Sequence, residues 1–330
     1  MTDEIVVLAT PIFGAPLTPE MLQRIAAAGS VQVIPVSRDG LVHAEGDAAV
    51  GAARVLLRGG GPASVLDHLV GRAPQLTWIH SVAAGIDRVA TPLVRSRAIT
   101  VTNARGVFSR PIAEYVVMML LAIARRLPQL LELQRERTWQ PLRGSELGEL
   151  TVGIIGYGSI GTELARLLEP FGTQVLATRR RPERGVGDAA NVELFGYDRQ
   201  DAVLRQADVV VLTAPLTDET AGMIGAEQLD QMRESAWLIN IARGRLIDEL
   251  ALRRALESGS IAGAVLDVFN EEPLPPDSPL YATPNLIITP HTSWSSDRVA
   301  ERGLELFIHN LRRFLAGEPL ENVVDLEAGY

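Results

Sequence analysis

Short β-branched runs alternate along the chain with longer stretches in which apolar residues recur at helical spacing. In the first hundred residues the short runs predict strands at residues 5–9, 54–58, 76–80 and 99–102. Helical periodicity between them predicts helices over residues 19–28 and 62–70. Strands that alternate with helices indicate a parallel sheet covered on both faces.

A second set with the same alternation begins at Thr151. Between the two sets, Pro111 opens a long apolar helix to residue 126, and the polar, proline-containing residues 127–150 predict a helix end and a connecting loop. We expect strands at residues 151–155, 174–178, 208–213, 236–240, 263–267 and 285–289, and helices at residues 160–168, 200–207, 226–232, 249–258 and 299–315. The pattern therefore predicts an α/β protein with two doubly wound parallel sheets.

The turn after the strand at 151–155 carries three glycines in G-x-G-x-x-G spacing: Gly156, Gly158 and Gly161. The first permits a tight turn, the second allows a pyrophosphate to approach the backbone, and the third lets the helix pack closely on the strand. The helix that follows offers its N-terminal N–H groups, near Ser159 and Ile160, to phosphates. A preceding strand and a following helix make this a predicted dinucleotide-binding turn rather than an incidental one.

Polar side chains follow three later strands of the second set. Arg243 follows the strand at 236–240, Glu271 and Glu272 follow the strand at 263–267, and His291 follows the strand at 285–289. Doubly wound sheets bind ligands at the carboxyl ends of their strands. An arginine, a carboxylate and a histidine are therefore expected to meet near one cofactor.

Composition narrows the class of function. The formal net charge of −9 argues against a nucleic-acid partner. The chain has no cysteine, which excludes disulfides and fits a cytoplasmic protein. The most apolar helix is shorter than the roughly 20 residues of a membrane span, and the acidic N-terminus is unlike a signal peptide. No metal site is expected, because no cysteine or H-E-x-x-H motif is present.

Seven blocks of sequence, in order, resemble the D-isomer-specific 2-hydroxyacid dehydrogenases. They are SVAAGIDRV (81–89), VTNARGVFSRPIAEY (101–115), TVGIIGYGSIG (151–161), TAPLTDETAGMI (213–224), LINIARGRLIDE (238–249), LDVFNEEPLP (266–275) and ITPH (288–291). The resemblance implies a flavodoxin-like substrate domain at residues 1–102, a Rossmann cofactor domain at residues 103–291, and a segment at residues 292–330 that returns to the substrate domain. It also implies an active site in the cleft between the two domains.

The same resemblance implies roles for individual residues. Arg243 would hold the oxygens of the substrate, His291 would be the general acid and base, and Glu272 would pair with His291 while Glu271 is solvated. Asp267 is either a structural carboxylate or a cofactor contact. The backbone N–H groups of Ala83, Ala84 and Gly85 would bind the substrate carboxylate, and further cofactor contacts would come from Pro215, Thr220, Ile241 and Ala242. Trp294, three residues after His291, either packs or lines the pocket, and its size departs from the small residues that the resemblance leads us to expect there.

The end of the second strand of the cofactor domain bears on the choice of nicotinamide. An NAD-preferring Rossmann unit has an acidic residue there, about 20 residues past the glycines. Here the strand is followed by Arg179, Arg180 and Arg181. Guanidinium groups would bind the 2′-phosphate of NADP, so NADP is favoured and NAD remains an alternative if the arginines form only a solvated turn.

The resemblance thus implies an enzyme that reduces a small 2-oxo acid, such as glyoxylate or hydroxypyruvate, to a D-2-hydroxy acid. The resemblance implies a homodimer joined through the cofactor domain. Two alternatives stay open. One is a 3-phosphoglycerate-type dehydrogenase of the same family, and the other is a non-catalytic NAD(P)-binding corepressor or sensor.

Overall fold

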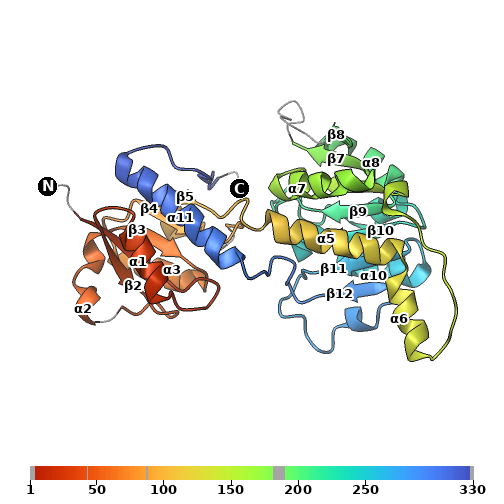
Figure 1. Cartoon of the computed structure of the whole chain (residues 1–330), viewed down its shortest axis with the longest axis horizontal. Coiled ribbons are helices and arrows are strands. Elements are labelled where there is room, and N and C mark those ends of the chain that lie inside the picture. The colour runs from red at the N-terminus through yellow and green to blue at the C-terminus, as the bar shows by residue number, and fades with distance from the viewer. Residues whose placement is uncertain (1–3, 43, 87, 181–189, 328–330) are drawn as a thin grey trace. The chain divides into compact units, whose positions relative to one another are not determined.

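The computed structural model describes residues 4–42, 44–86, 88–180 and 190–327. The chain divides into two compact units, one made of Met1–Phe108 with Ser296–Tyr330 and the other of Ser109–Ser295. These divisions lie a few residues after the predicted boundaries at 102 and 291. Each unit is built around its own parallel sheet (Figure 1).

Unit 1 contains a five-stranded sheet in the order β2-β1-β3-β4-β5, in which all neighbours are parallel. The strands are β1 (Ile5–Ala9), β2 (Val31–Pro35), β3 (Ala53–Arg58), β4 (Trp78–Ser81) and β5 (Thr100–Thr102). The hydrophobic pattern does not predict strand β2. This strand lies at the edge of the sheet and is only partly buried, so a glutamine and a final proline break its apolar pattern.

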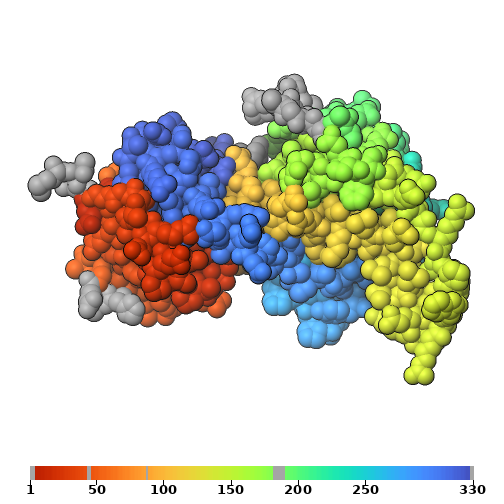
Figure 2. Space-filling model, viewed as in Figure 1, coloured from red at the N-terminus to blue at the C-terminus, as the bar shows by residue number. Residues whose placement is uncertain are grey.

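The two faces of this sheet are covered by different helices. Helices α2 (Ala44–Asp47), α3 (Ala63–Arg72) and α4 (Pro92–Ser96) belong to one side, and α1 (Pro19–Ala26) with α11 (Val299–Ala316) covers the other. On α11, Leu304, Phe307 and Leu311 are fully buried in one cluster with Val7 and Trp78 of the sheet. Figures 1 and 2 show α11, in blue, against the red N-terminal elements. The final helix therefore completes the core of unit 1.

Unit 2 contains a seven-stranded sheet in the order β12-β11-β10-β9-β6-β7-β8, again entirely parallel. The strands are β6 (Thr151–Ile155), β7 (Gln174–Arg179), β8 (Val192–Gly196), β9 (Val209–Leu212), β10 (Trp237–Asn240), β11 (Gly263–Leu266) and β12 (Leu286–Ile288). The order reverses between β6 and β9. In an open parallel sheet this is the point where ligands bind. The predicted fold class is confirmed in both units.

Helices lie on both faces of this sheet. One face is covered by α8 (Gln200–Gln206), α9 (Ala226–Gln231) and α10 (Glu249–Ser258), whose buried leucines share a cluster with the sheet. On the other face, α7 (Ser159–Leu168) packs on Ile154, and α5 (Ser109–Ala124) lies beside α7 (Figure 1).

Residues 127–135 correct one prediction, because they form helix α6 (Leu127–Arg135) and not a connecting loop. Pro128 lies in the first turn of α6, where a missing N–H group costs nothing. Arg126 adopts a left-handed φ of 54° and separates α6 from α5. Three of the four leucines of α6 are exposed and none is buried, so the helix lacks the buried stripe that makes a helix recognisable in a sequence.

Candidate active site

Each glycine of the turn after β6 has the steric reason that its position predicts. Gly156 has a φ of +103°, and a Cβ there would lie 2.5 Å from the backbone of Ala214. A Cβ on Gly161 would lie 3.1 Å from Ile154, so its absence lets α7 lie close to β6. The space around Gly158 is open, with one backbone atom 4.0 Å away. The turn therefore leaves room above Gly158 and the first N–H groups of α7 for an anionic group.

Strand β7 ends at Arg179, which is half-buried. The next residue, Arg180, is exposed and forms an ion pair with Glu219, with 2.6 Å between Nη2 and Oε2. The third arginine of the sequence, Arg181, lies outside the described residues. Thr178 is buried at the end of the same strand, and its hydroxyl accepts a hydrogen bond from the N–H of Gly156 at 3.3 Å.

The loop after β9 contains Pro215 and Thr220. The Thr220 hydroxyl donates to the Pro215 carbonyl at 2.7 Å and accepts from the Thr217 N–H at 2.8 Å. Thr220 is buried, whereas Pro215 is exposed. The buried Thr220 side chain therefore fixes the conformation of this loop through two hydrogen bonds to its backbone.

Arg243 follows β10, and its backbone is fixed by Asn240. The Asn240 amide donates to the Arg243 carbonyl at 2.8 Å and its oxygen accepts from the Ala242 N–H at 3.1 Å. Arg243 itself donates from Nη1 to the Ala242 carbonyl at 2.6 Å, and Ile241 and Ala242 are buried. Sequence reasoning did not select Asn240; a polar residue at the end of an otherwise apolar strand was its only signal.

Gly244 brings this loop onto the loop after β11. A Cβ on Gly244 would lie 2.0 Å from the Phe269 carbonyl carbon and 2.4 Å from the Asn270 nitrogen. Asn270 is also held by its N–H, which donates to Glu249 Oε1 at 2.8 Å. Gly244, the residue after Arg243, is therefore in direct backbone contact with the segment that leads to Glu272.

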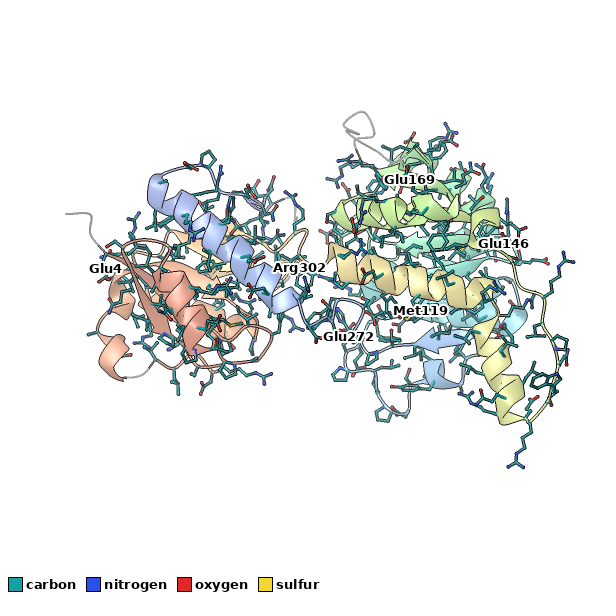
Figure 3. The ribbon with its side chains drawn as sticks, viewed as in Figure 1. Glu4, Met119, Glu146, Glu169, Glu272 and Arg302 are labelled. Atoms are coloured by element: carbon teal, nitrogen blue, oxygen red, sulfur yellow. The ribbon has the colours of Figure 1, made fainter. Side chains whose placement is uncertain are left out.

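The structure brings His291 and Glu272 together. His291 Nδ1 lies 2.7 Å from Glu272 Oε2, and Glu272 Oε1 accepts the Phe269 N–H at 3.0 Å. Glu272 lies on the loop that follows β11 (Figure 3), whereas its rival Glu271 is exposed. A carboxylate only accepts hydrogen bonds, so Nδ1 carries a proton and Nε2 is the nitrogen that can gain or lose one. Both side chains stay accessible, with 41% and 35% exposed.

Asp267 is completely buried and organises the residues around His291. Its Oδ1 accepts from the Thr289 hydroxyl at 2.6 Å and the Thr292 N–H at 2.8 Å, and its Oδ2 accepts from the Ser293 N–H at 3.0 Å. These bonds make Asp267 a structural carboxylate of the loop. Trp294 is half-buried in the same loop, and its ring N–H donates to the His291 carbonyl at 2.9 Å.

In unit 1, Ala83, Ala84 and Gly85 follow β4. The Ala83 N–H donates to Ser81 Oγ at 3.2 Å, and the Ala84 carbonyl accepts from the side-chain amide of Asn103 at 2.7 Å. Ala84 is exposed and its two neighbours are half-buried. Asn103 fixes this loop from the end of β5, a role that its sequence position alone did not indicate.

His80 lies just before this loop but points into the core. It is fully buried, and its Nδ1 lies 2.8 Å from Thr102 Oγ1. Burial lowers the pKa of His80 to about 3. His80 is therefore neutral and packed at neutral pH.

The described part of the chain offers neither a metal centre nor a membrane span. Its residues contain no group of three or more histidines, cysteines or acidic residues that could hold a metal ion. Within the same residues, no helix is both long enough and apolar enough to cross a membrane.

Comparisons with known proteins identify the family. A sequence profile described as "D-isomer specific 2-hydroxyacid dehydrogenase, NAD binding domain" matches residues 117–293. A glyoxylate reductase from Korarchaeum cryptofilum is 36% identical over 261 residues, which cover 77% of this chain and 78% of the relative.

Solved structures extend the match over both units. A D-isomer-specific 2-hydroxyacid dehydrogenase from Xanthobacter autotrophicus Py2, in complex with NADPH and MES, is 30% identical with a TM-score of 0.85 over 100% of both chains. An NADPH-dependent glyoxylate/hydroxypyruvate reductase from Sinorhizobium meliloti, in complex with NADP and sulfate, is 28% identical with a TM-score of 0.82 over 99% of this chain and 100% of its own. This chain therefore belongs to the D-isomer-specific 2-hydroxyacid dehydrogenases and is an NAD(P)-dependent oxidoreductase.

Proposed function

We propose that the enzyme uses NADPH to reduce a small 2-oxo acid, such as glyoxylate or hydroxypyruvate, to the D-2-hydroxy acid. The observation that carries the proposal is the 2.7 Å contact between His291 Nδ1 and Glu272 Oε2. An imidazole that is held by a carboxylate at one nitrogen can exchange a proton at the other, as carbonyl reduction requires. Relatives named glyoxylate reductase support the substrate class.

Each residue of the site has one task in this reaction. The Arg243 guanidinium binds the 2-oxo and carboxylate oxygens, and its charge polarises the carbonyl. His291 gives the Nε2 proton to the carbonyl oxygen while Glu272 stabilises the imidazolium. A nicotinamide held by the cofactor turn would supply the hydride for C2. In alcohol oxidation the same proton returns to His291. The N–H groups of Ala83, Ala84 and Gly85 and the ring of Trp294 complete the substrate contacts in this proposal.

The turn after β6 fits the pyrophosphate of a dinucleotide. We assign its contacts to Gly156, Gly158, Ser159, Ile160 and Gly161, because the open space at Gly158 lies beside the first N–H groups of α7. Pro215, Ile241 and Ala242 are assigned to the rest of the cofactor. Thr220 and Asp267 belong to the proposed cofactor site because their hydrogen bonds fix two of the loops that surround it.

We assign the 2′-phosphate of NADP to Arg179 and Arg180. The ion pair of Arg180 with Glu219, on the loop after β9, supports this, because the Arg180 guanidinium already binds an anionic group there. Two relatives that this chain resembles in structure were solved with NADPH or NADP. An Arg179→Asp variant is expected to lose NADPH preference in kcat/KM. A preference that stays unchanged in this variant contradicts the assignment.

We further assign to the enzyme a homodimer that buries the exposed apolar surface of α5 and α6. This surface contains Met118, Leu121, Leu127, Leu130 and Leu131, whose exposed fractions are 37–51%. An exposed apolar patch of this kind is typical of a protein interface.

The absence of cysteine supports a cytoplasmic location, which fractionation of cells with a specific antibody would test.

The direct test follows nicotinamide absorbance with a panel of 2-oxo acids, with NADPH and NADH side by side. His291→Ala is expected to lower kcat by at least about 100-fold, because general acid catalysis contributes that much. His309→Ala is the matched control, since His309 also pairs with a carboxylate, Glu321, at 3.0 Å but lies on the surface of α11. Full activity in His291→Ala would overturn the proposed mechanism. Tight NADPH binding without turnover on any 2-oxo acid would favour the sensor.

A further inference from the structure

A chain of three side chains connects helix α5 to the loop that carries His291. Tyr115 Oη lies 2.7 Å from Thr289 Oγ1, and Thr289 Oγ1 lies 2.6 Å from Asp267 Oδ1. We propose that Tyr115 is a positioning residue for proton transfer and acts on His291 through Thr289 and Asp267. The proposal rests on the assignment of His291 as the general acid.

The direction of the hydrogen bonds follows from the chemistry of the groups. The Asp267 carboxylate has no proton to give, so the Thr289 hydroxyl donates its single proton to Asp267. Thr289 Oγ1 can then only accept from Tyr115, which must be the donor. Burial raises the pKa of Tyr115 to about 12 and outweighs the lowering effect of the hydrogen bond with Thr289, and the charge of Asp267 raises the pKa as well. The Tyr115 hydroxyl therefore keeps its proton throughout the working range of the enzyme.

Asp267 connects the Tyr115–Thr289 hydrogen bond to His291 through backbone hydrogen bonds. Its carboxylate accepts the N–H groups of Thr292 and Ser293, and its carbonyl accepts the N–H of His291 at 2.8 Å. His291 has a φ of 49°, a left-handed conformation that residues with a Cβ rarely adopt. The residues on both sides of this unusual backbone are thus tied to one buried carboxylate, whose orientation Thr289 and Tyr115 fix.

Tyr115 connects the His291 loop to a helix beside the cofactor turn. Tyr115 lies on α5, and α5 lies beside α7, the helix that begins at the glycine turn (Figure 1). The loop with the proton donor is therefore anchored to the same helix pair that frames the cofactor turn. The network therefore fixes the position of the His291 backbone relative to α5 and α7. A displacement of about 1 Å at a catalytic group lowers rates strongly without weakening binding.

A purely structural role for Tyr115 and a positioning role predict different effects of Tyr115→Phe. Tyr115→Phe would then lower only thermal stability. A positioning role predicts that Tyr115→Phe lowers kcat about tenfold, while KM for NADPH stays within about twofold. Tyr281→Phe is the matched control, because it makes the same chemical change in unit 2 at a side chain that is 57% exposed. It is expected to leave kcat and KM unchanged.

Substitutions at Thr289 test the chain independently of the folding of Tyr115→Phe. Thr289→Ser keeps the hydroxyl and is expected to retain kcat within about threefold, whereas Thr289→Val removes the hydroxyl and is expected to lose at least about tenfold. Unchanged kcat in both Tyr115→Phe and Thr289→Val would overturn the proposal. Failure of the proposed function is distinguishable, because His291→Ala would then remain active whatever the Tyr115 and Thr289 variants do.

Discussion

Gly244 lies so close to the backbone of Phe269 and Asn270 that even a methyl group has no room there. The atoms that a Cβ would meet belong to the backbone and cannot rotate away. Gly244→Ala is therefore expected to separate Arg243 from the loop that carries Glu272. We expect kcat/KM to fall at least about tenfold and the midpoint of thermal unfolding to fall by several degrees.

The matched control for this prediction is Gly71→Ala. Gly71 is an exposed glycine in α3, and a Cβ on it would meet no atom of another element within 4 Å. Alanine there is expected to stabilise the helix by about 0.5–1 kcal/mol without changing kinetics. Steady-state kinetics and calorimetry on both variants check the pair, and normal activity in Gly244→Ala would show that the two loops do not depend on this contact.

His80 predicts how the stability of unit 1 responds to acid. Its folded pKa of about 3 lies below the ordinary value of 6.5, because burial disfavours the charged ring. The unfolded chain then binds more protons between these two values. The His80 contribution is fully present above pH 6.5 and is lost as the pH falls toward 3, with a slope of about 1.4 kcal/mol per pH unit.

A His80→Asn variant isolates this effect, because asparagine can keep a hydrogen bond to Thr102 but does not titrate. Between pH 7.5 and pH 5 the native protein is expected to lose about 2 kcal/mol more unfolding free energy than the variant. Urea denaturation at the two pH values measures the difference. An equal loss in both proteins would mean that His80 does not set this dependence.

The pairing of Glu272 with His291 could be predicted from the sequence, but the hydrogen-bond network around it could not. Arg243, Glu272 and His291 follow apolar strands, and local patterning places such residues at one edge of a sheet. Tyr115 and Thr289 are 174 positions apart, and only the packing of α5 brings them together. The proposed contacts of Ala83, Ala84 and Gly85 with substrate stay a prediction.

At the scale of elements, the hydrophobic pattern found the strands at the centre of each sheet and missed two of the four edge strands, β2 and β8. Central parallel strands are buried on both faces and form continuous apolar runs. Strands β2 and β8 are partly exposed, so polar residues interrupt their runs. Helix α6 was missed for the related reason that none of its described side chains is buried. Its apolar residues have no buried face that patterning could indicate.

The exposed leucines of α6 lead to a prediction about assembly. Leu130→Lys places a charge within the proposed dimer surface, where desolvation would be costly, and is expected to convert the dimer to a monomer. Leu250→Lys, at a leucine of α10 that is 49% exposed, is the control and should leave the mass unchanged. Light scattering at several concentrations measures both. A native protein with the mass of one chain would rule out the proposed dimer.

At the scale of the whole molecule, the two units differ in whether they are built from one segment of the chain or from two. Unit 2 is a continuous segment, whereas unit 1 combines the start of the chain with α11. Removal of every residue after Ser295 would uncover Trp78, whose ring stacks on Phe307 with 5.5 Å between centroids. We expect limited proteolysis of this shortened chain to degrade unit 1 and spare unit 2. The milder Phe307→Ala variant is expected to cost about 3–5 kcal/mol. Resistance of unit 1 in the shortened chain would contradict this view.

The discontinuity of unit 1 has a consequence for biosynthesis. During translation, residues 5–108 leave the ribosome first but cannot complete their hydrophobic core, because Leu304, Phe307 and Leu311 of α11 have not yet been made. Unit 2 can fold as soon as its last strand emerges. The nascent chain therefore carries an uncovered apolar sheet face while nearly two hundred further residues are added. During this interval the uncovered sheet face is available for a chaperone to bind. The unit whose synthesis begins first is therefore the last to complete its core.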